Sequence, residues 1–179
     1  MSQFLHGYRA WAWLLLLCAA LYLPGIAALP AFDRDEARFM QASRQMLETG
    51  DLVRIRFQDE ARNKKPAGIY WLQAGTTALV ADKTTMERWS YRIPSVLGAT
   101  GAVLLLFALA CLFSERRTAF LAAALLASCL LLVAEAHMAK TDAVLLATVV
   151  AAMYGLARAF VRARDKVPRD WASGLWFWI

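Results

Sequence analysis

Residues 10–29 read AWAWLLLLCAALYLPGIAAL, and the acidic motif DRDE follows after a short link at positions 33–36. No charged residue lies between Arg9 and that motif, and an uncharged run of this length matches the roughly 20 residues that a helix needs to cross a bilayer. A cleaved signal peptide is the alternative, but its apolar region would have only about 7–15 residues. We therefore interpret residues 10–29 as the first membrane span, which Pro24 and Pro30 bend or end.

The overall composition is also that of a membrane protein. Hydrophobic residues make up 60% of the chain and its mean hydropathy is +0.43, above the roughly 45–50% apolar share of soluble domains. The net charge of +6 lies in segments that flank apolar runs, and no nucleic-acid-binding module is visible. Membrane lipids, and not nucleic acid, are therefore the expected partners. Cys18, Cys111 and Cys129 show neither disulfide nor metal-ligand spacing, and we expect buried free thiols.

Three further apolar runs predict the second to fourth spans, at residues 93–113, 119–134 and 143–161. In the second span, Gly98 and Ala102 form a small-xxx-small pair that lets another helix approach closely. A fifth run begins at residues 171–179 and is too short to cross. The predicted fold is therefore all-α, a polytopic transmembrane helix bundle, and we expect the chain to be the N-terminal part of a longer protein.

The polar segment 33–92 between the first two spans predicts two helices, at about residues 34–48 and 66–81. In the first helix, Asp33 is the expected N-cap in a capping box with Glu36, and Gly50 is the expected C-cap. This helix is amphipathic and too polar to cross a membrane, which suits a position along the membrane surface. Residues 51–65 are charged and irregular, with at most a short extended piece at 53–57.

The second helix decides the topology, because residues 66–81 could either span the membrane or lie at its surface. If they spanned it, Arg9 would lie opposite the basic cluster at residues 158–169, against the tendency of cations to stay cytoplasmic. With an interfacial or re-entrant helix, Arg9, Arg116-Arg117 and that cluster share one side. The N-terminus is therefore expected in the cytoplasm, with the loops 33–92 and 135–142 on the outer face.

Acidic residues stand where these outer loops meet the spans. Asp35 and Glu36 could act as a general base on an acceptor hydroxyl or amine, and Asp142 could position the acceptor or assist the base. The structural alternative is that these carboxylates only cap helices and complement helix dipoles. Spacing alone leaves both interpretations open.

Two lysines, Lys64 and Lys65, precede the helix-starting Pro66. They could simply be solvated among lipid headgroups. Lysines at a helix N-terminus, however, oppose the helix dipole unless an anion is bound between them and the free N–H groups. A lipid phosphate is such an anion, and fixed cations would stabilise the charge that it gains as a leaving group. His137 has no second His or Cys at ligand spacing, so we interpret it as a solvated loop residue.

The ordered set of these motifs resembles the bacterial relatives of protein O-mannosyltransferases, which include the aminoarabinose transferase of lipid A. The resemblance rests on Asp35-Glu36-Ala37-Arg38, Gly50-Asp51, Lys65-Pro66 and Tyr70-Trp71-Leu72, taken in this order. It implies a membrane glycosyltransferase of the C-type (GT-C) fold in the bacterial inner membrane. Such an enzyme moves a sugar from a polyprenyl-phosphate donor to a lipid, glycan or protein acceptor and inverts the anomeric centre.

The resemblance also assigns roles to single residues. Asp35 looks like the catalytic aspartate of the first outer loop, with Glu36 beside it, and Asp142 looks like the acidic residue at the start of the fourth span. Lys65 looks like the lysine that binds the donor phosphate. Lys64 and Arg38 are expected to bind this phosphate with it. The resemblance leaves a divalent metal possible. In the lipid A enzyme an acidic residue precedes the lysine, but Lys64 occupies that position here, which disfavours a metal site built on it.

Two other classes of function compete with this interpretation. A non-catalytic lipid-binding or assembly subunit could use the same cationic loop. A transporter is disfavoured, because none of the four predicted complete spans carries an acid or base near its middle, where ion-coupled sites usually lie.

Overall fold

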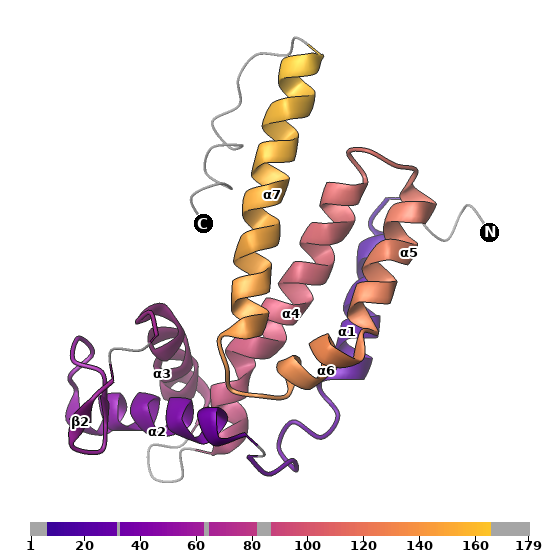
Figure 1. Cartoon of the computed structure of the whole chain (residues 1–179). Helices are drawn as coiled ribbons and strands as arrows, with labels where there is room; N and C mark the ends of the chain where they lie inside the picture. Colours follow the sequence, from indigo (N-terminus) through magenta and orange to yellow (C-terminus); the bar gives the residue numbers. More distant parts are fainter. Residues whose placement is uncertain (1–6, 32, 63–64, 82–86, 166–179) are drawn as a thin grey trace.

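The computed structural model describes residues 7–31, 33–62, 65–81 and 87–165. The predicted start of a fifth span at 171–179 and Lys64 lie outside the described residues. Within them the regular elements are all helices, apart from one hairpin of two-residue strands, which confirms the predicted all-α class. Figure 1 shows the elements in order: α1 Arg9–Tyr22, α2 Arg34–Thr49, β1 Arg56–Phe57, β2 Glu60–Ala61, α3 Gly68–Val80, α4 Arg88–Ala110, α5 Arg116–Ala127, α6 Leu130–Ala136 and α7 Asp142–Arg164.

The two longest helices, α4 and α7, pack side by side in the bundle (Figure 1). A Cβ atom on Gly98 of α4 would lie only 2.8 Å from the backbone N and Cα atoms of Val144 in α7. Ala102, one turn further along α4, is fully buried. The predicted close approach of a second helix at this small-xxx-small pair is therefore confirmed.

Helix α1 ends at Tyr22, whereas the first span was predicted to reach residue 29. Pro24 has no amide hydrogen to continue the helical bonding. Gly25 then adopts a φ of +83°, and its carbonyl accepts hydrogen bonds from the amides of Ala28 and Leu29, so the chain continues as turns. Fourteen residues extend about 21 Å, which is less than the roughly 30 Å of a bilayer core.

The predicted third span is broken into two helices, α5 and α6, which are bent by 60° relative to each other. The break falls at Ser128 and Cys129 and involves neither proline nor glycine. The Ser128 hydroxyl donates back to the carbonyl of Ala124 at 2.9 Å, a bond that competes with helix continuation. The hydroxyl of Tyr22 on α1 donates to the carbonyl of Ala127 at 3.0 Å. A neighbouring helix thus supplies a hydrogen bond to a carbonyl that the bend leaves free.

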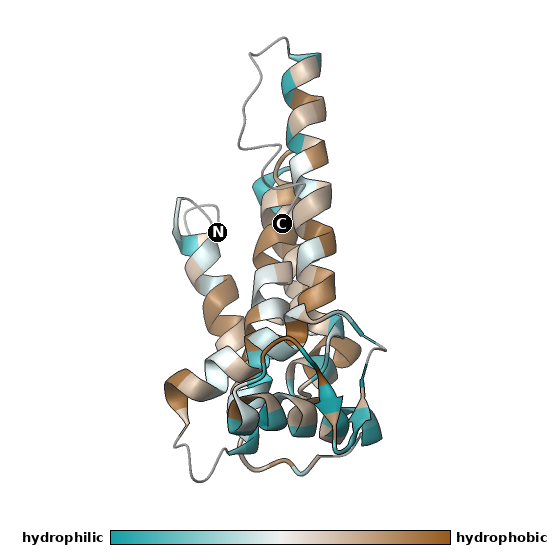
Figure 2. Cartoon of the chain, turned by 90° about the vertical axis from the view of Figure 1, so that its left-hand side faces the viewer, coloured by the Kyte–Doolittle hydropathy of each residue, from teal (hydrophilic) through white to brown (hydrophobic). Residues whose placement is uncertain are grey.

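Among the described residues, α4 and α7 are each long and apolar enough to cross a membrane, and α5 with α6 meets the same test as one bent span. The upright helices are mostly apolar along their length, as Figure 2 shows, and polar residues gather at the base and at the tips. Of the three cysteines, which are all free, only Cys18 is buried. The expected burial of Cys111 and Cys129 is wrong, because both lie at helix ends on the outer surface of the bundle.

The polar segment forms a separate layer across one end of the bundle. It consists of α2, the β1–β2 hairpin and α3, and α3 packs against both α2 and the first part of α4 (Figure 1). Helix α2 matches the predicted bounds, with Asp33 as N-cap and Gly50 as left-handed C-cap. Helix α3 begins at Gly68, two positions after Pro66, which was the expected first helical residue.

Candidate functional site

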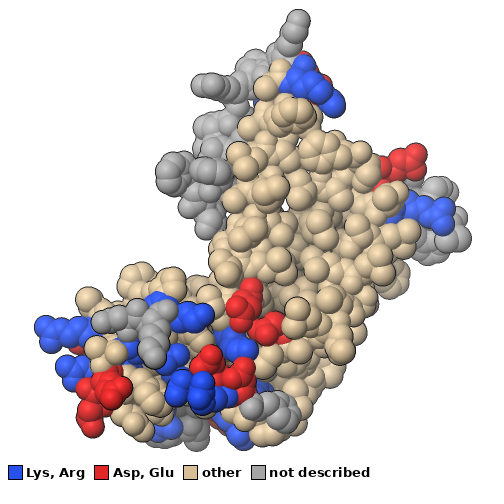
Figure 3. Space-filling view, viewed as in Figure 1, with Lys and Arg blue, Asp and Glu red and all other residues tan. Residues whose placement is uncertain are grey.

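Charged side chains collect over the layer of α2, α3 and the hairpin, whereas the shaft of the bundle is almost free of them (Figure 3). The α6–α7 loop reaches the same end. The Nζ atom of Lys140 in that loop lies 2.7 Å from Oδ2 of Asp33. The loops 33–92 and 135–142 thus touch at one end of the bundle. That this end lies on the outer face of the membrane stays a prediction.

Asp33 serves as the N-cap of α2, because its Oδ1 atom accepts a hydrogen bond of 2.8 Å from the amide of Asp35. Its contacts stabilise the carboxylate: the Lys140 hydrogen bond and the Asp35 amide lower the pKa of Asp33. The same hydrogen bond raises the pKa of Lys140, with smaller contributions from Glu135 and Asp142. At neutral pH both partners are therefore charged, and Asp33 has a structural role.

Asp35 lies in the first turn of α2, where its carboxylate is half exposed. Its ion-pair partner is Arg38, one turn along the helix, at 3.6 Å between Nη1 and Oδ1. This separation is longer than that of a strong charge-assisted hydrogen bond. The carboxylate is therefore accessible to another molecule and has a cation beside it.

Glu36 has the opposite environment, although it is the next residue. It is fully buried, and its Oε1 atom accepts a 2.8 Å hydrogen bond from Nε of Arg92. The same oxygen accepts the amide of Ala139 from the α6–α7 loop at 3.1 Å. The expected capping box with Asp33 is therefore not formed, because the Glu36 side chain is directed into the packed interior. Oε2 of Glu36 is buried without a hydrogen-bond partner in the described part of the chain.

Arg92 completes this arrangement, although no role in the site was predicted for it from the sequence. Its guanidinium is buried and donates to the carbonyl oxygens of Ile26, Leu29 and Pro30, at 2.7, 2.9 and 3.1 Å. Because these groups belong to the α1–α2 loop, one ion pair fastens that loop, α2, α4 and the α6–α7 loop to each other. The sequence feature that could have indicated this role is the position of Arg92, a charged residue directly before the apolar run of the second span.

Lys65 is exposed and precedes α3, and its segment is fastened to α2 through aromatic contacts. Nε of Arg62 donates to the hydroxyl of Tyr70 at 2.7 Å, and the Tyr70 ring packs on Phe39 with centroids 5.3 Å apart. Phe39 is one helical turn after Asp35. The predicted phosphate-binding segment therefore lies against the half of α2 that carries Asp35 and Arg38.

Asp142 is the first residue of α7, next to the loop that carries Lys140. His137 was expected to be solvated, but it is half-buried. Its ring nitrogens lie 2.7 Å from the carbonyl of Val133 and 2.9 Å from that of Pro24. His137 therefore links α6 to the α1–α2 loop.

The carboxylates of this region do not fit a divalent metal. The described residues include no group of three or more His, Cys, Asp or Glu side chains that could hold one. The ammonium of Lys140 already lies between two of the acids, 2.7 Å from Asp33 and 3.8 Å from Glu135. A bound cation would have to displace this lysine.

The fold and the site together define an integral membrane protein whose helices carry a charged loop cluster at one end of the bundle. The profile of the family described as dolichyl-phosphate-mannose-protein mannosyltransferase matches residues 64–178, which is more than half of the chain. The chain therefore belongs to that family, and the resemblance drawn from the motifs is confirmed at this level. The matched residues include Lys65, Arg92 and Asp142 but not Asp35.

Curated relatives carry one name, undecaprenyl phosphate-alpha-4-amino-4-deoxy-L-arabinose arabinosyl transferase. The protein of Pectobacterium carotovorum subsp. carotovorum (strain PC1) is 34% identical over 119 residues, which cover 66% of this chain and 21% of the relative. That of Erwinia tasmaniensis is 32% identical over 148 residues, which cover 82% of this chain and 26% of the relative. The chain thus spans about a fifth to a quarter of the length of these relatives. No solved structure matches it significantly.

Proposed function

We propose that the complete protein carrying this chain is an inverting glycosyltransferase that uses a polyprenyl-phosphate sugar, and that this chain forms part of it. Family membership and the names of the relatives support the donor class. The observation that carries the site assignment is the contrast between neighbours, a half-exposed Asp35 beside a fully buried Glu36. Of these two carboxylates, Asp35 is the one that an acceptor can reach.

In the proposed reaction, the Asp35 carboxylate accepts a proton from the acceptor hydroxyl or amine. The acceptor oxygen or nitrogen then forms a bond to the anomeric carbon of the sugar. The bond from that carbon to the phosphate oxygen breaks, and its electron pair stays on the phosphate. Polyprenyl phosphate leaves with additional negative charge, which the cations of Lys65 and Arg38 stabilise.

Glu36 has a different part in this proposal. Its carboxylate is already occupied by Arg92 and the Ala139 amide, so it cannot approach an acceptor. We assign it to holding the first turn of α2, and with it Asp35, in position. Asp142 lies at the same end of the bundle and is proposed to contact the acceptor.

The acceptor is proposed to be a lipid, glycan or protein at the outer face of the bacterial inner membrane. The reacting loops lie at one end of apolar helices, so a lipid-linked donor can lie in the bilayer and present its phosphate there. The charge distribution between loops favours a cytoplasmic N-terminus and a periplasmic site.

Lys65 tests the donor assignment by kinetics. Losing one preorganised donor to developing charge typically lowers turnover on the order of 100-fold or more, so Lys65→Ala should slow transfer by this amount and weaken donor binding. Lys65→Arg keeps the charge but replaces a compact ammonium with a planar fork, and it should restore binding more than rate. The assay uses the complete protein in detergent, with the polyprenyl-phosphate sugar varied at saturating acceptor.

Arg88→Ala is the matched control for this series, because Arg88 is an exposed cation at the start of α4 and is not assigned to the site. It should leave the kinetics close to wild type. If Lys65→Ala behaved like Arg88→Ala, the lysine would be a headgroup contact, and the lipid-binding subunit would become the better description.

A further inference from the structure

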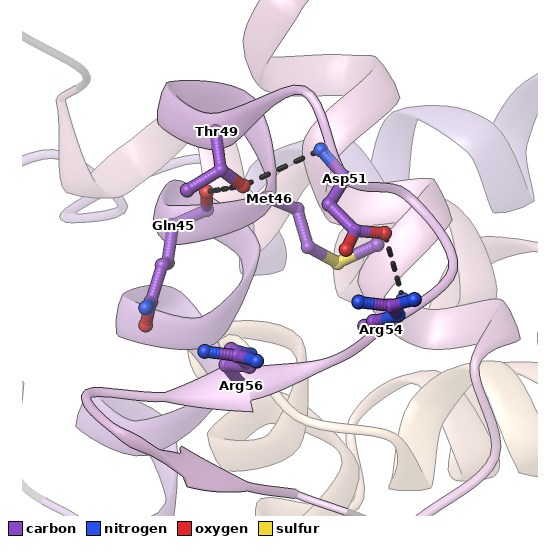
Figure 4. A pocket seen from close by; sticks show the side chains of 6 residues that line it. All are labelled: Gln45, Met46, Thr49, Asp51, Arg54 and Arg56. Atoms are coloured by element: carbon purple, nitrogen blue, oxygen red, sulfur yellow. Dashed lines mark hydrogen bonds between the residues drawn. The ribbon is translucent and has the colours of Figure 1, made fainter.

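A second basic site lies at the other end of α2. A cavity of about 330 Å³ opens between the last turns of α2 and the segment of residues 51–56 that leads into β1. Figure 4 shows the side chains that line it: Gln45, Met46, Thr49, Asp51, Arg54 and Arg56. Along the helix axis, Thr49 is about 21 Å from Asp35 at 1.5 Å per residue. The cavity is therefore remote from the proposed general base, and neither Lys65 nor Arg38 lines it.

Most polar groups around this cavity are already bonded within the protein. The Gln45 side chain donates to the carbonyl of Gln58 at 2.9 Å and accepts its amide at 3.0 Å. Oδ1 of Asp51 accepts the amides of Val53 and Arg54 at 3.1 and 3.0 Å. These bonds fix the shape of the segment and leave little polar capacity for a ligand.

The two guanidinium groups are the exception. Arg54 and Arg56 are exposed, and neither side chain forms an ion pair or hydrogen bond with the described part of the chain. Their charges, with the neighbouring amides as the larger cause, help to lower the pKa of Asp51. With one carboxylate facing two guanidiniums, the rim of the cavity keeps a net positive charge, and it offers planar donors that suit a phosphate.

An apolar groove begins on the same segment. It has a volume of about 360 Å³ and is lined mainly by Leu52, Val53, Trp71, Gly75 and Ala78. Val53 is 83% exposed and Trp71 is 54% exposed. Nε1 of Trp71 donates to the carbonyl of Leu52 at 2.7 Å, which holds the segment against α3. The polar cavity and the apolar groove are thus both lined by side chains of residues 51–54.

We propose that this paired surface binds one anionic phospholipid of the membrane. Arg54 and Arg56 hold the headgroup phosphate, and the acyl chains lie along Val53, Trp71 and Ala78. Charge complementarity favours this occupant, because a cationic pair directly beside exposed apolar side chains matches a lipid that carries a phosphate on hydrocarbon chains. The inference does not depend on the glycosyl donor, since the lipid would fasten the α2, hairpin and α3 layer to the bilayer surface.

Titration of the complete protein in detergent with long-chain phosphatidylglycerol, followed by native mass spectrometry, tests the headgroup contact. One cation near an anionic lipid corresponds to about a fivefold change in affinity. The double variant Arg54→Gln/Arg56→Gln should therefore bind this lipid roughly 25-fold more weakly. Arg44→Gln/Arg88→Gln removes the same charge from exposed positions outside the cavity and should bind like wild type. Equal losses in both double variants would overturn the site.

Further measurements distinguish lipid binding from binding of free phosphate, and this surface from the donor site. Inorganic phosphate at the same concentration should not compete, and Val53→Asn should weaken phosphatidylglycerol binding, because the acyl chains supply part of the affinity. Effective competition by phosphate together with an unaffected Val53→Asn would identify a simple anion site and contradict the proposal. Lys65→Ala should keep phosphatidylglycerol binding, and a loss there would place this lipid at the donor site instead.

Discussion

Asp35 and Glu36 show how strongly one residue's position along a helix changes its chemistry. The first is half exposed with one cation 3.6 Å away, and the second is fully buried against Arg92. A buried ion pair is a weak source of net stability, but removal of one partner leaves an uncompensated charge. The pair therefore constrains the geometry of the site even though it takes no part in the proposed chemistry.

Glu36→Gln tests this positioning role. Breaking a buried ion pair typically costs about 3–5 kcal/mol, so the variant should unfold at a distinctly lower temperature. The same substitution in an exposed pair of the same helix, Glu48→Gln, removes the partner of Arg44 and should cost only about 0.2–1 kcal/mol. Thermal unfolding of the complete protein in detergent measures both.

Transfer activity provides the second readout for this pair of variants. A Glu36→Gln protein with unchanged unfolding temperature but no turnover would assign the carboxylate to the reaction itself. We expect instead that activity declines together with the folded fraction, and that Glu48→Gln remains active.

At the scale of the elements, the contact between α4 and α7 depends on the absence of a side chain at Gly98. A methyl group there would lie 2.8 Å from backbone atoms of Val144, which cannot move like the end of a flexible side chain. Gly101, three residues later in the same helix, would place its methyl group 3.9 Å from the Cβ of Ala147. The two glycines therefore offer a matched comparison.

Gly98→Ala should destabilise the protein, because overpacking typically costs about 1–3 kcal/mol and exceeds the gain in helix propensity. Gly101→Ala should be neutral or stabilising, since the added methyl group fits and glycine is less favourable in a helix by roughly 0.5–1 kcal/mol. Unfolding temperatures in detergent decide the question. Equal unfolding temperatures for both variants would mean that α4 and α7 are not in close contact at Gly98.

Local patterns predicted the helices whose boundaries are set by neighbouring residues. Asp33 and Gly50 define α2 because an N-cap and a left-handed C-cap act within one turn. The bend between α5 and α6 was not predictable in this way. It depends on the Tyr22 hydroxyl, which reaches the Ala127 carbonyl from more than one hundred positions away in the sequence.

The same limitation applies to the site. The acidic and basic motifs could be located from their order, and the structure brings Asp35, Arg38 and the Lys65 segment to one end of the bundle. The ion pair between Glu36 and Arg92 joins residues 56 positions apart. Charged residues are rarely buried in a protein core, so the sequence did not predict this pair. Sequence patterns therefore indicated candidates but not which acid remains accessible.

At the scale of the whole molecule, the polar layer packs against one end of the bundle (Figure 1). A cysteine at Asp59, which is exposed between β1 and β2, should react with an impermeant maleimide added outside the inner membrane. A cysteine at the exposed Arg117 should react only after permeabilisation, because the basic loops are expected to be cytoplasmic. Cys111 and Cys129 must first be replaced by serine, since both are exposed.

The reverse labelling pattern would contradict the topology and would place the charged cluster in the cytoplasm. The proposed site would then be inaccessible to a periplasmic acceptor, although the contacts between its residues would be unchanged.

The most direct test of the account is the turnover of Asp35→Asn in the complete protein, with polyprenyl-phosphate sugar and acceptor both saturating. The backbone N–H of residue 35 would still donate to the Asp33 carboxylate, and the exposed contact with Arg38 contributes little to stability. Folding and donor binding should therefore be retained. An amide cannot accept the proton, and loss of a general base typically lowers the rate about 100- to 10,000-fold. We predict a fall within this range at an unchanged unfolding temperature. Near-normal turnover would contradict the account and leave Asp35 as a surface residue in the first turn of α2.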